Sequence, residues 1–257
     1  MNRIAIYRDS ICLAEKAAQA EVCLVFDGLY REGDVIVFES DTRFARVRVD
    51  QSLEPASLYL PTGSFVYKVP LAGDHLAAYP PMAFQTQRHL LSLAADTGDA
   101  YRNLALNPLD QRGSVTAYPH VTATVETRDE AVFCARNVID GLVCAAGHGV
   151  WPYQSWGIGA RTDASLTLDF GREVEIDTME LYLRADFPHD AYWTQATAVF
   201  SDGSEQSFPL RGVEGCQRIT VGTRRVRWVT LDRLVKCDMP SAFPALRQLM
   251  VYGRDIA

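Results

Sequence analysis

The chain has 257 residues, of which 48% are hydrophobic and 22% are charged, which is the composition of a folded, soluble protein with a sizeable core. Its net charge of −7 argues against an electrostatic hold on nucleic acid or on an anionic membrane, because both require a basic patch, and the short run Arg224, Arg225, Arg227 does not make one. The six cysteines are scattered without a CxxC pair, which gives zinc and thioredoxin chemistry little support.

The N-terminal stretch MNRIAIYRDSICL lacks the uninterrupted apolar segment of a signal peptide, because Arg8 and Asp9 break it. No later segment approaches the length that is needed to span a bilayer. We therefore expect the chain as given to be cytoplasmic, with neither a membrane nor a nucleic acid as its partner.

The first part of the chain is predicted to be an N-terminal β-sandwich domain over residues 1–72, with a short helix over residues 9–20. After this helix come short segments rich in β-branched and aromatic residues, separated by turn sequences: AEVCLVF, GDVIVFES, RFARVRVD, ASLYL and SFVYKVP. Short strands of this kind are typical of a small antiparallel sandwich.

Residues 73–117 are predicted to form a linking region that wraps over one or both domains, since the regular pattern loosens there. AAYPPMAF carries paired prolines, NPLDQRGS is rich in turn residues, and TQRHLLSLAA fits one or two helical turns.

Residues 118–257 again alternate between apolar and polar positions. The candidate strands are SLTLDFG, TMELYLR, TQATAVF, EQSFPL, QRITVG, RRVRWVTL and LRQLMVYG, with SDG as a hairpin turn after the third. Evenly spaced strands without intervening helices are not the pattern of an α/β enzyme. The predicted fold class is therefore all-β, with two β-sandwich or jelly-roll domains.

Five short motifs follow one another in this second half: ARNVIDG, QSW, LTLDFG, FSDGS and LMVYG. In this order they resemble the discoidin-like domain, also called the coagulation-factor type C or galactose-binding-like fold. The resemblance covers about residues 118–257 and implies an eight-stranded β-sandwich whose loops at one end bind a ligand, in bacteria most often a sugar. It also implies that Trp156 fills the core and that many relatives are non-catalytic modules.

The resemblance has one departure that concerns a metal. Many relatives carry a glutamate before the Val-Tyr-Gly strand end that helps to hold a structural calcium, whereas the nearest position here is Gln248. Asp140 remains available, so a structural calcium at Asp140 stays open. No cofactor is otherwise required.

Two loops, at residues 147–156 and 184–193, carry the mixture that sugar recognition demands: aromatic rings for the C–H face of a pyranose, and planar donors and acceptors for its hydroxyls. In the family layout both loops emerge at the same end of the sandwich. The predicted ligand-binding residues are His148, Trp151, Arg184, Asp186, His189 and Trp193. The arginine and the aspartate are expected to bind hydroxyls, the histidines to form directional hydrogen bonds, and one tryptophan to be the stacking platform.

Structural roles remain open for the same residues. Arg184 and Asp186 could form an ion pair that holds the loop, His189 beside Asp190 could bond backbone amides, and Trp193 opens a strand and could be a core residue.

The sequence therefore predicts a non-catalytic carbohydrate-binding protein with a saccharide ligand, which could work beside a carbohydrate-active enzyme. One alternative is a glycan-active enzyme with Asp186, His189 and Asp190 as its acid/base group. Another is a protein-interaction module, since discoidin-like domains also bind proteins. The sequence contains no GxSxG, HExxH or glycine-rich phosphate loop, so no catalytic residue is assigned.

Overall fold

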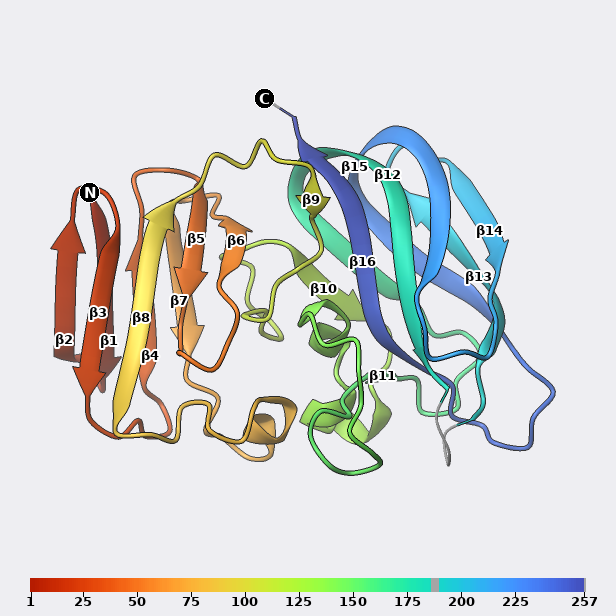
Figure 1. The fold of residues 1–257 in the computed structure, drawn as a ribbon, viewed down its shortest axis with the longest axis horizontal. Coiled ribbons are helices and arrows are strands. Elements are labelled where there is room, and N and C mark those ends of the chain that lie inside the picture. The colour runs from red at the N-terminus through yellow and green to blue at the C-terminus, as the bar shows by residue number, and fades with distance from the viewer. Residues whose placement is uncertain (186–189, 257) are drawn as a thin grey trace.

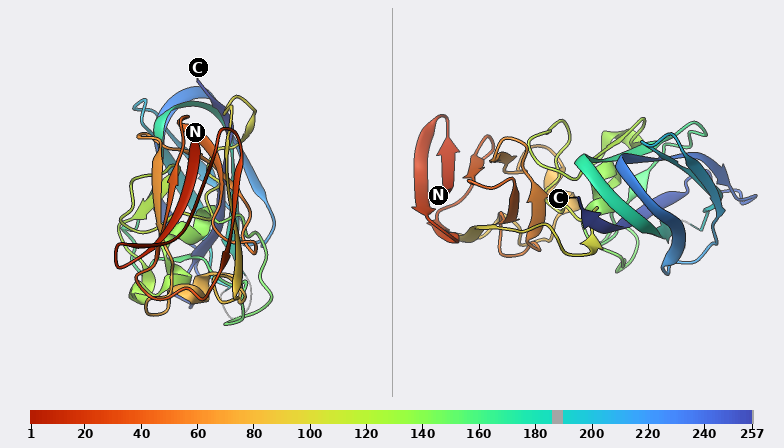
Figure 2. Two further views of the ribbon diagram at one scale, coloured as in Figure 1. Left: turned by 90° about the vertical axis from the view of Figure 1, so that its left-hand side faces the viewer. Right: turned by 90° about the horizontal axis from the view of Figure 1, so that it is seen from above.

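In the computed structural model, which describes residues 1–185 and 190–256, the chain folds into two β-sandwiches that lie side by side (Figures 1 and 2). The predicted all-β fold class is confirmed, since the described helices are short 3₁₀ turns. None of the helices in these two ranges is long and apolar enough to cross a membrane.

The N-terminal sandwich consists of two four-stranded antiparallel sheets. One sheet has the order β2 (Ile11–Ala18), β1 (Asn2–Arg8), β4 (Val35–Glu39) and β7 (Ser64–Lys68). The other has the order β3 (Val22–Asp27), β8 (Arg88–Ala95), β5 (Phe44–Arg48) and β6 (Ala56–Tyr59). Alternate side chains such as Ile4, Ile36 and Leu91 are buried between the sheets, so the period-two pattern of the sequence describes the core.

The helix predicted over residues 9–20 is wrong, because most of this segment is strand β2, paired antiparallel with β1. Asp9 and Ser10 form a two-residue connection, and both have positive φ angles, of 47° and 69°. Two consecutive residues with positive φ give the turn geometry that matches the twist of a β-hairpin. The turn therefore reverses the chain into a strand at the position where the alanine pattern suggested a helix.

Strand β8 corrects a second prediction, that TQRHLLSLAA forms one or two helical turns in the linking region. Its central residues pair with β3 on one side and with β5 on the other, as Leu93 does with Val22 and Val47. Residues 88–95 therefore belong to the N-terminal sandwich, and the crossing to the second sandwich begins after Ala95.

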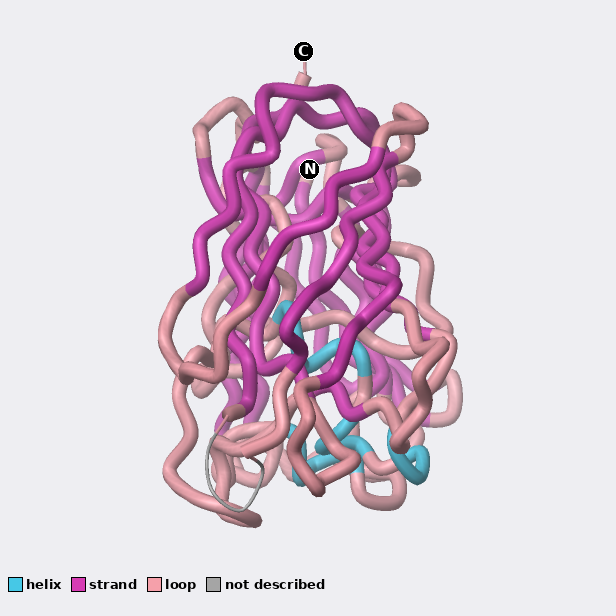
Figure 3. Tube along the Cα trace, turned by 90° about the vertical axis from the view of Figure 1, so that its right-hand side faces the viewer, coloured by secondary structure: helices cyan, strands magenta, loops and turns pink. Residues whose placement is uncertain are grey.

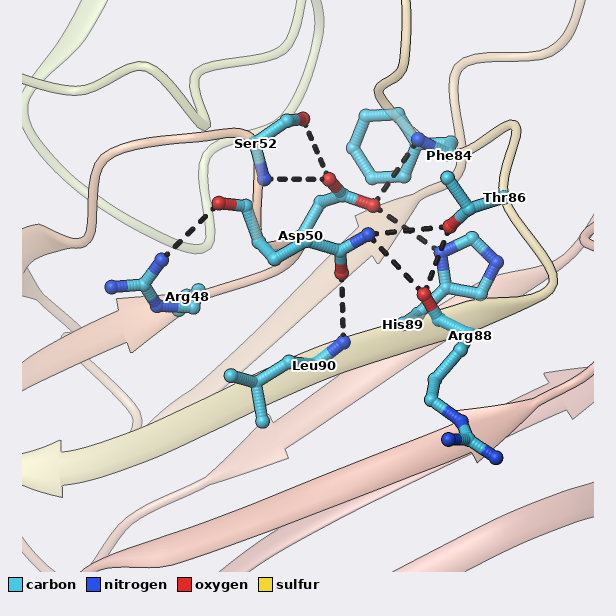
Figure 4. Close-up of polar contacts among 9 residues, drawn as sticks. Arg48, Asp50, Ser52, Phe84, Thr86, Arg88, His89 and Leu90 are labelled. Atoms are coloured by element: carbon cyan, nitrogen blue, oxygen red, sulfur yellow. Dashed lines mark hydrogen bonds and ion pairs between the residues drawn. The ribbon is translucent and has the colours of Figure 1, made fainter.

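A buried carboxylate ties the start of β8 to the end of β5 (Figure 4). Asp50 accepts hydrogen bonds from the amides of Ser52 and Phe84, at 2.9 and 3.1 Å, and lies 3.3 Å from Nδ1 of His89. Burial raises the pKa of Asp50, but these hydrogen bonds outweigh burial and hold the pKa below its ordinary value. The network is enclosed, so it fixes the segment before β8 and offers no open site.

The C-terminal sandwich is formed by one antiparallel sheet with the order β11, β16, β12, β15, β13, β14, to which β10 adds on β12 and β9 on β16. Its long strands are β12 (Leu166–Arg184), β13 (Trp193–Phe200), β14 (Glu205–Pro209), β15 (Gln217–Lys236) and β16 (Ala245–Asp255). Its short strands are β9 (Arg102–Asn103), β10 (His120–Ala123) and β11 (Trp156–Gly157).

The sheet makes two layers because β12 and β15 change partners halfway along their length. Residues 166–169 of β12 pair with β10 and with the second half of β15, whereas residues 174–184 pair with β16 and with the first half of β15. The register shifts between Asp169 and Val174, at Gly171 with φ of 68°. Such a bulge bends the strand, and the two halves then enclose one core that contains Trp156.

The helical turns lie mainly at the lower edge of the molecule in Figure 1. Their bounds are η1 (His75–Ala78), η2 (Thr127–Asp129), η3 (Ala131–Phe133) and η4 (Ala135–Ile139). The last of these contains the Asn-Val-Ile part of the motif that precedes Asp140 and Gly141.

A buried ion pair of the C-terminal sandwich lies against aromatic rings of the N-terminal sandwich. The guanidinium of Arg172 pairs with Asp255, which also accepts a hydrogen bond of 2.8 Å from Arg102. The same guanidinium lies 5.2 and 5.0 Å from the ring centroids of Phe44 and Tyr59 in the N-terminal sandwich. Burial lowers the pKa of Arg172, which Asp255 opposes, so the arginine depends on this carboxylate to stay charged in the interface.

Arg172→Ala is therefore expected to destabilise the protein by about 3 kcal/mol or more, because it leaves the Asp255 carboxylate buried with only Arg102 as partner. The free energy of unfolding in urea measures this loss. Arg161→Ala is a matched control, since its pair with Asp163 is exposed and should contribute less than about 1 kcal/mol. Equal, small losses for both variants would contradict a central role for the Arg172 pair.

Candidate functional site

The candidate site lies where loops gather at the lower end of the C-terminal sandwich (Figures 1 and 3). The first loop, residues 142–155, connects η4 with β11, and its ends are held by one side chain. Asp140 accepts a hydrogen bond of 2.9 Å from the Leu142 amide and one of 3.1 Å from the side-chain amide of Gln154. A bond of 3.0 Å from the amide of Ala146 to the carbonyl of Pro152 closes the loop further out.

Arg184, the last residue of β12, joins this first loop to the second. Its Nη2 donates a hydrogen bond of 3.1 Å to Nδ1 of His148, and its guanidinium lies 5.8 Å from the ring centroid of Tyr153. The start of the second loop therefore lies beside the first loop, while residues 186–189 of the second loop lie outside the described residues. Arg184 itself is only 1% exposed, whereas His148 is exposed, so the arginine supports the histidine from below.

The two predicted tryptophans have different surroundings. Trp193 is 2% exposed, and its ring centroid lies 6.0 Å from that of Trp156 inside the core, so it is a core residue and not a stacking platform. Trp156 fills the core as predicted. Trp151 is half-buried in the first loop, and its indole N–H has no hydrogen-bond partner in the described part of the chain.

Two of the predicted residues, Asp186 and His189, lie outside the described residues. Their roles as hydroxyl binders, and with Asp190 as an acid/base group, stay predictions. Asp190 is described and is exposed.

Two buried polar residues beneath the loops were not predicted as ligand-binding residues, although Gln248 was compared from the sequence with the calcium-binding glutamate of relatives. Arg247 and Gln248 lie near the start of β16, where the pairing with β12 shifts register between Tyr182 and Leu183. The side-chain amide of Gln248 is 0% exposed, and both its oxygen and its nitrogen lack a hydrogen-bond partner within residues 1–185 and 190–256. The one signal in the sequence was that Arg-Gln interrupts an otherwise apolar strand, LRQLMVY.

The Asp140 carboxylate does not present the donor set of a calcium site. Both of its oxygens already accept hydrogen bonds from N–H groups, which a calcium ion would have to displace. Among the described residues, no group of three or more His, Cys, Asp or Glu side chains is placed to hold a metal ion. The structural calcium at Asp140 that the sequence left open stays a prediction, and no step of the proposed function depends on it.

Burial raises the pKa of Asp140 to about 6, although the nearby charge of Arg136 opposes the shift. Because the folded protein holds this proton more tightly than the unfolded chain does, the free energy of unfolding should fall as the pH rises from about 4 to about 6, and then stay level. Integrated over the shift from 3.8 to about 6, the fall is about 3 kcal/mol.

Asp140→Asn should remove this fall, because asparagine does not titrate and its oxygen can still accept from the Leu142 amide. Urea unfolding of both proteins between pH 4 and pH 7 measures the difference. Parallel pH profiles for the two proteins would show that Asp140 does not titrate in this window.

Comparison with known proteins gives matches among solved structures. No family model matches the sequence, and no curated protein sequence does. Chitosan-binding module 1 of a chitosanase/glucanase from Paenibacillus sp. IK-5 is 19% identical over 59% of this chain and 99% of the module, with a TM-score of 0.42. The family 32 carbohydrate-binding module of NanJ from C. perfringens, in complex with galactose, is 16% identical over 51% of this chain and 91% of its own, with a TM-score of 0.40.

A mutant of the lectin-binding domain of lectinolysin, in complex with Lewis b, is 13% identical over 60% of this chain and 98% of its own, with a TM-score of 0.44. Each of the three matches covers nearly the whole of the matched domain but only 51–60% of this chain.

Proposed function

We propose that the C-terminal sandwich binds a saccharide at its loop end and does not convert it. The observation that carries this proposal is the hydrogen bond between Arg184 and His148, which holds an exposed imidazole on the loop that also carries the half-buried Trp151. An aromatic ring and a directed polar group are the two elements that a pyranose requires.

The contact with Arg184 also fixes which nitrogen of His148 carries the proton. A guanidinium only donates hydrogen bonds, so Nδ1 of His148 must accept and a neutral imidazole then carries its proton on Nε2. An Nε2–H group is the kind of donor from which the oxygen of a sugar hydroxyl accepts a hydrogen bond. Arg184 is thus a positioning residue in this proposal, and the role of direct hydroxyl binder moves from Arg184 to His148.

The platform role goes to Trp151, because Trp193 is enclosed in the core. The ring of Trp151 keeps part of its surface accessible. The loop that carries it is closed by the two hydrogen bonds that Asp140 accepts and by the hydrogen bond from the Ala146 amide to the Pro152 carbonyl. A loop held in this way loses little conformational freedom when a ligand binds, so little of the binding free energy is lost to ordering the loop.

A saccharide-binding sandwich of this kind would act by keeping a glycan close to a separate active site. A carbohydrate-active enzyme as its partner is therefore part of the proposal.

Trp151→Ala is expected to weaken saccharide binding at least tenfold, about 1.4 kcal/mol, because it removes the stacking surface. Trp228→Ala is the matched control, since Trp228 is an exposed tryptophan on β15, opposite Asp169 and away from the loops. A glycan array identifies the ligand, and isothermal titration calorimetry then compares the two variants with the native protein. Equal losses in both variants, or no glycan bound at high protein concentration, would contradict the proposal.

A further inference from the structure

A cavity lies beside strand β10. Figure 1 shows this strand between the two sandwiches. The cavity has a volume of about 360 Å³, is lined by residues between 112 and 136, and shares no residue with the loop site. This volume is in the range of sites for small molecules, which is about 300 to 1,000 Å³. Its polar groups show what kind of molecule would fit.

His120 lines the cavity and is held in one orientation by a buried carboxylate. Its Nδ1 lies 2.7 Å from Oδ1 of Asp110, and the other oxygen of Asp110 accepts a hydrogen bond of 3.1 Å from the Val121 amide. The side chain of His120 is 7% exposed, and no described residue forms a hydrogen bond with its Nε2. Since Asp110 engages Nδ1, Nε2 is the nitrogen left for a molecule in the cavity.

Glu126 supplies a second unused polar atom. Its Oε1 accepts a hydrogen bond of 2.8 Å from the Ala135 amide. Its Oε2 is buried and meets the distance and angle limits of a hydrogen bond with no described residue, although the Cys134 thiol is close enough for the Glu126 charge to help raise the pKa of that thiol. The nearest cation, Nη1 of Arg112, is 3.6 Å away. A buried carboxylate oxygen without a hydrogen bond costs free energy, which a ligand with a donor would recover.

The charges around the cavity balance. The lining contains two arginines, Arg112 and Arg136, and two acidic residues, Glu126 and Asp129. Arg112 forms an ion pair with Asp129, and the half-buried Arg136 is close to the charge of Asp110 behind the cavity wall. A strongly charged ligand would therefore gain little. The thiol of Cys134 also lines the cavity, and burial raises its pKa to about 12, so it stays protonated at neutral pH and is not a nucleophile.

We infer that this cavity is a second binding site, independent of the loop site, for a neutral molecule of monosaccharide size that carries several hydroxyls. A hydroxyl can both donate and accept, so it pairs with Nε2 of His120 in either protonation state. A second hydroxyl donates to Oε2 of Glu126. The site holds its ligand by hydrogen bonds alone and forms no covalent bond.

NMR of the histidine side chains tests this inference, since the full chain contains five histidines and each gives its own ¹⁵N imidazole signals. D-glucose, D-galactose and D-mannose are titrated separately into the native protein and into Trp151→Ala, in which the loop site is impaired. At least one sugar should shift the His120 Nε2 signal in a saturable way, with the same dissociation constant in both proteins. Loss of the effect in Trp151→Ala would assign it to the loop site and overturn the inference.

Glu126→Gln is the decisive variant, because glutamine keeps an oxygen for the Ala135 amide but replaces the carboxylate that accepts from the ligand. The dissociation constant of the same sugar should rise at least tenfold. The variant's thermal unfolding and its His120–Asp110 signals show that the fold is retained, and Glu130→Gln, an exposed neighbouring carboxylate variant, should leave the constant unchanged. A constant unaffected by Glu126→Gln, or no saturable shift with any of the three sugars, would overturn the inference.

Discussion

The pair between Arg172 and Asp255 is the contact on which the arrangement of this molecule depends, because it lies on the two strands that also build the loop site. β12 carries Arg172 near its bend and ends at Arg184, while β16 begins beside Arg247 and ends at Asp255. The two strands pair along this whole length. The interface with the N-terminal sandwich and the site beneath the loops are therefore opposite ends of one pair of strands, and a change in the bend would alter both.

The loop site is built by polar groups that lie below the surface and position groups at the surface. Asp140 is buried and holds both ends of the first loop, and Arg184 is buried and holds His148. Burying a polar group costs free energy unless the group is hydrogen-bonded. When the group is hydrogen-bonded, as Asp140 and Arg184 are, the bonds fix the geometry of the loops above. A segment with such groups under its loops is more typical of a binding site than of a plain connection between strands.

The sequence predicted the fold well where burial alternates and poorly where geometry depends on a single turn or bulge. The five strands from Val22 to Lys68 could be predicted from local patterns, whereas the common end of the two loops was expected only from the family resemblance. The hairpin at Asp9 and Ser10 could not, because an alanine-rich edge strand has no apolar face that distinguishes it from a helix. The burial of Trp193 and of Gln248 could not be predicted either, because the face that a strand residue occupies depends on the pairing register and not on its residue type.

Strand β12 also sets the relation between the loop site and the cavity. Asp169 on this strand pairs with His120, whereas Arg184 at its end supports His148. At about 3.3 Å per residue, the strand segment between them spans at most roughly 50 Å, and the bend at Gly171 shortens it. The cavity shares no lining residue with the loop site, so the two sites would bind separate molecules, or separate residues of one extended chain. Because the strand between them is continuous, their separation is fixed, and a linked ligand would gain affinity only if its own length matched that spacing.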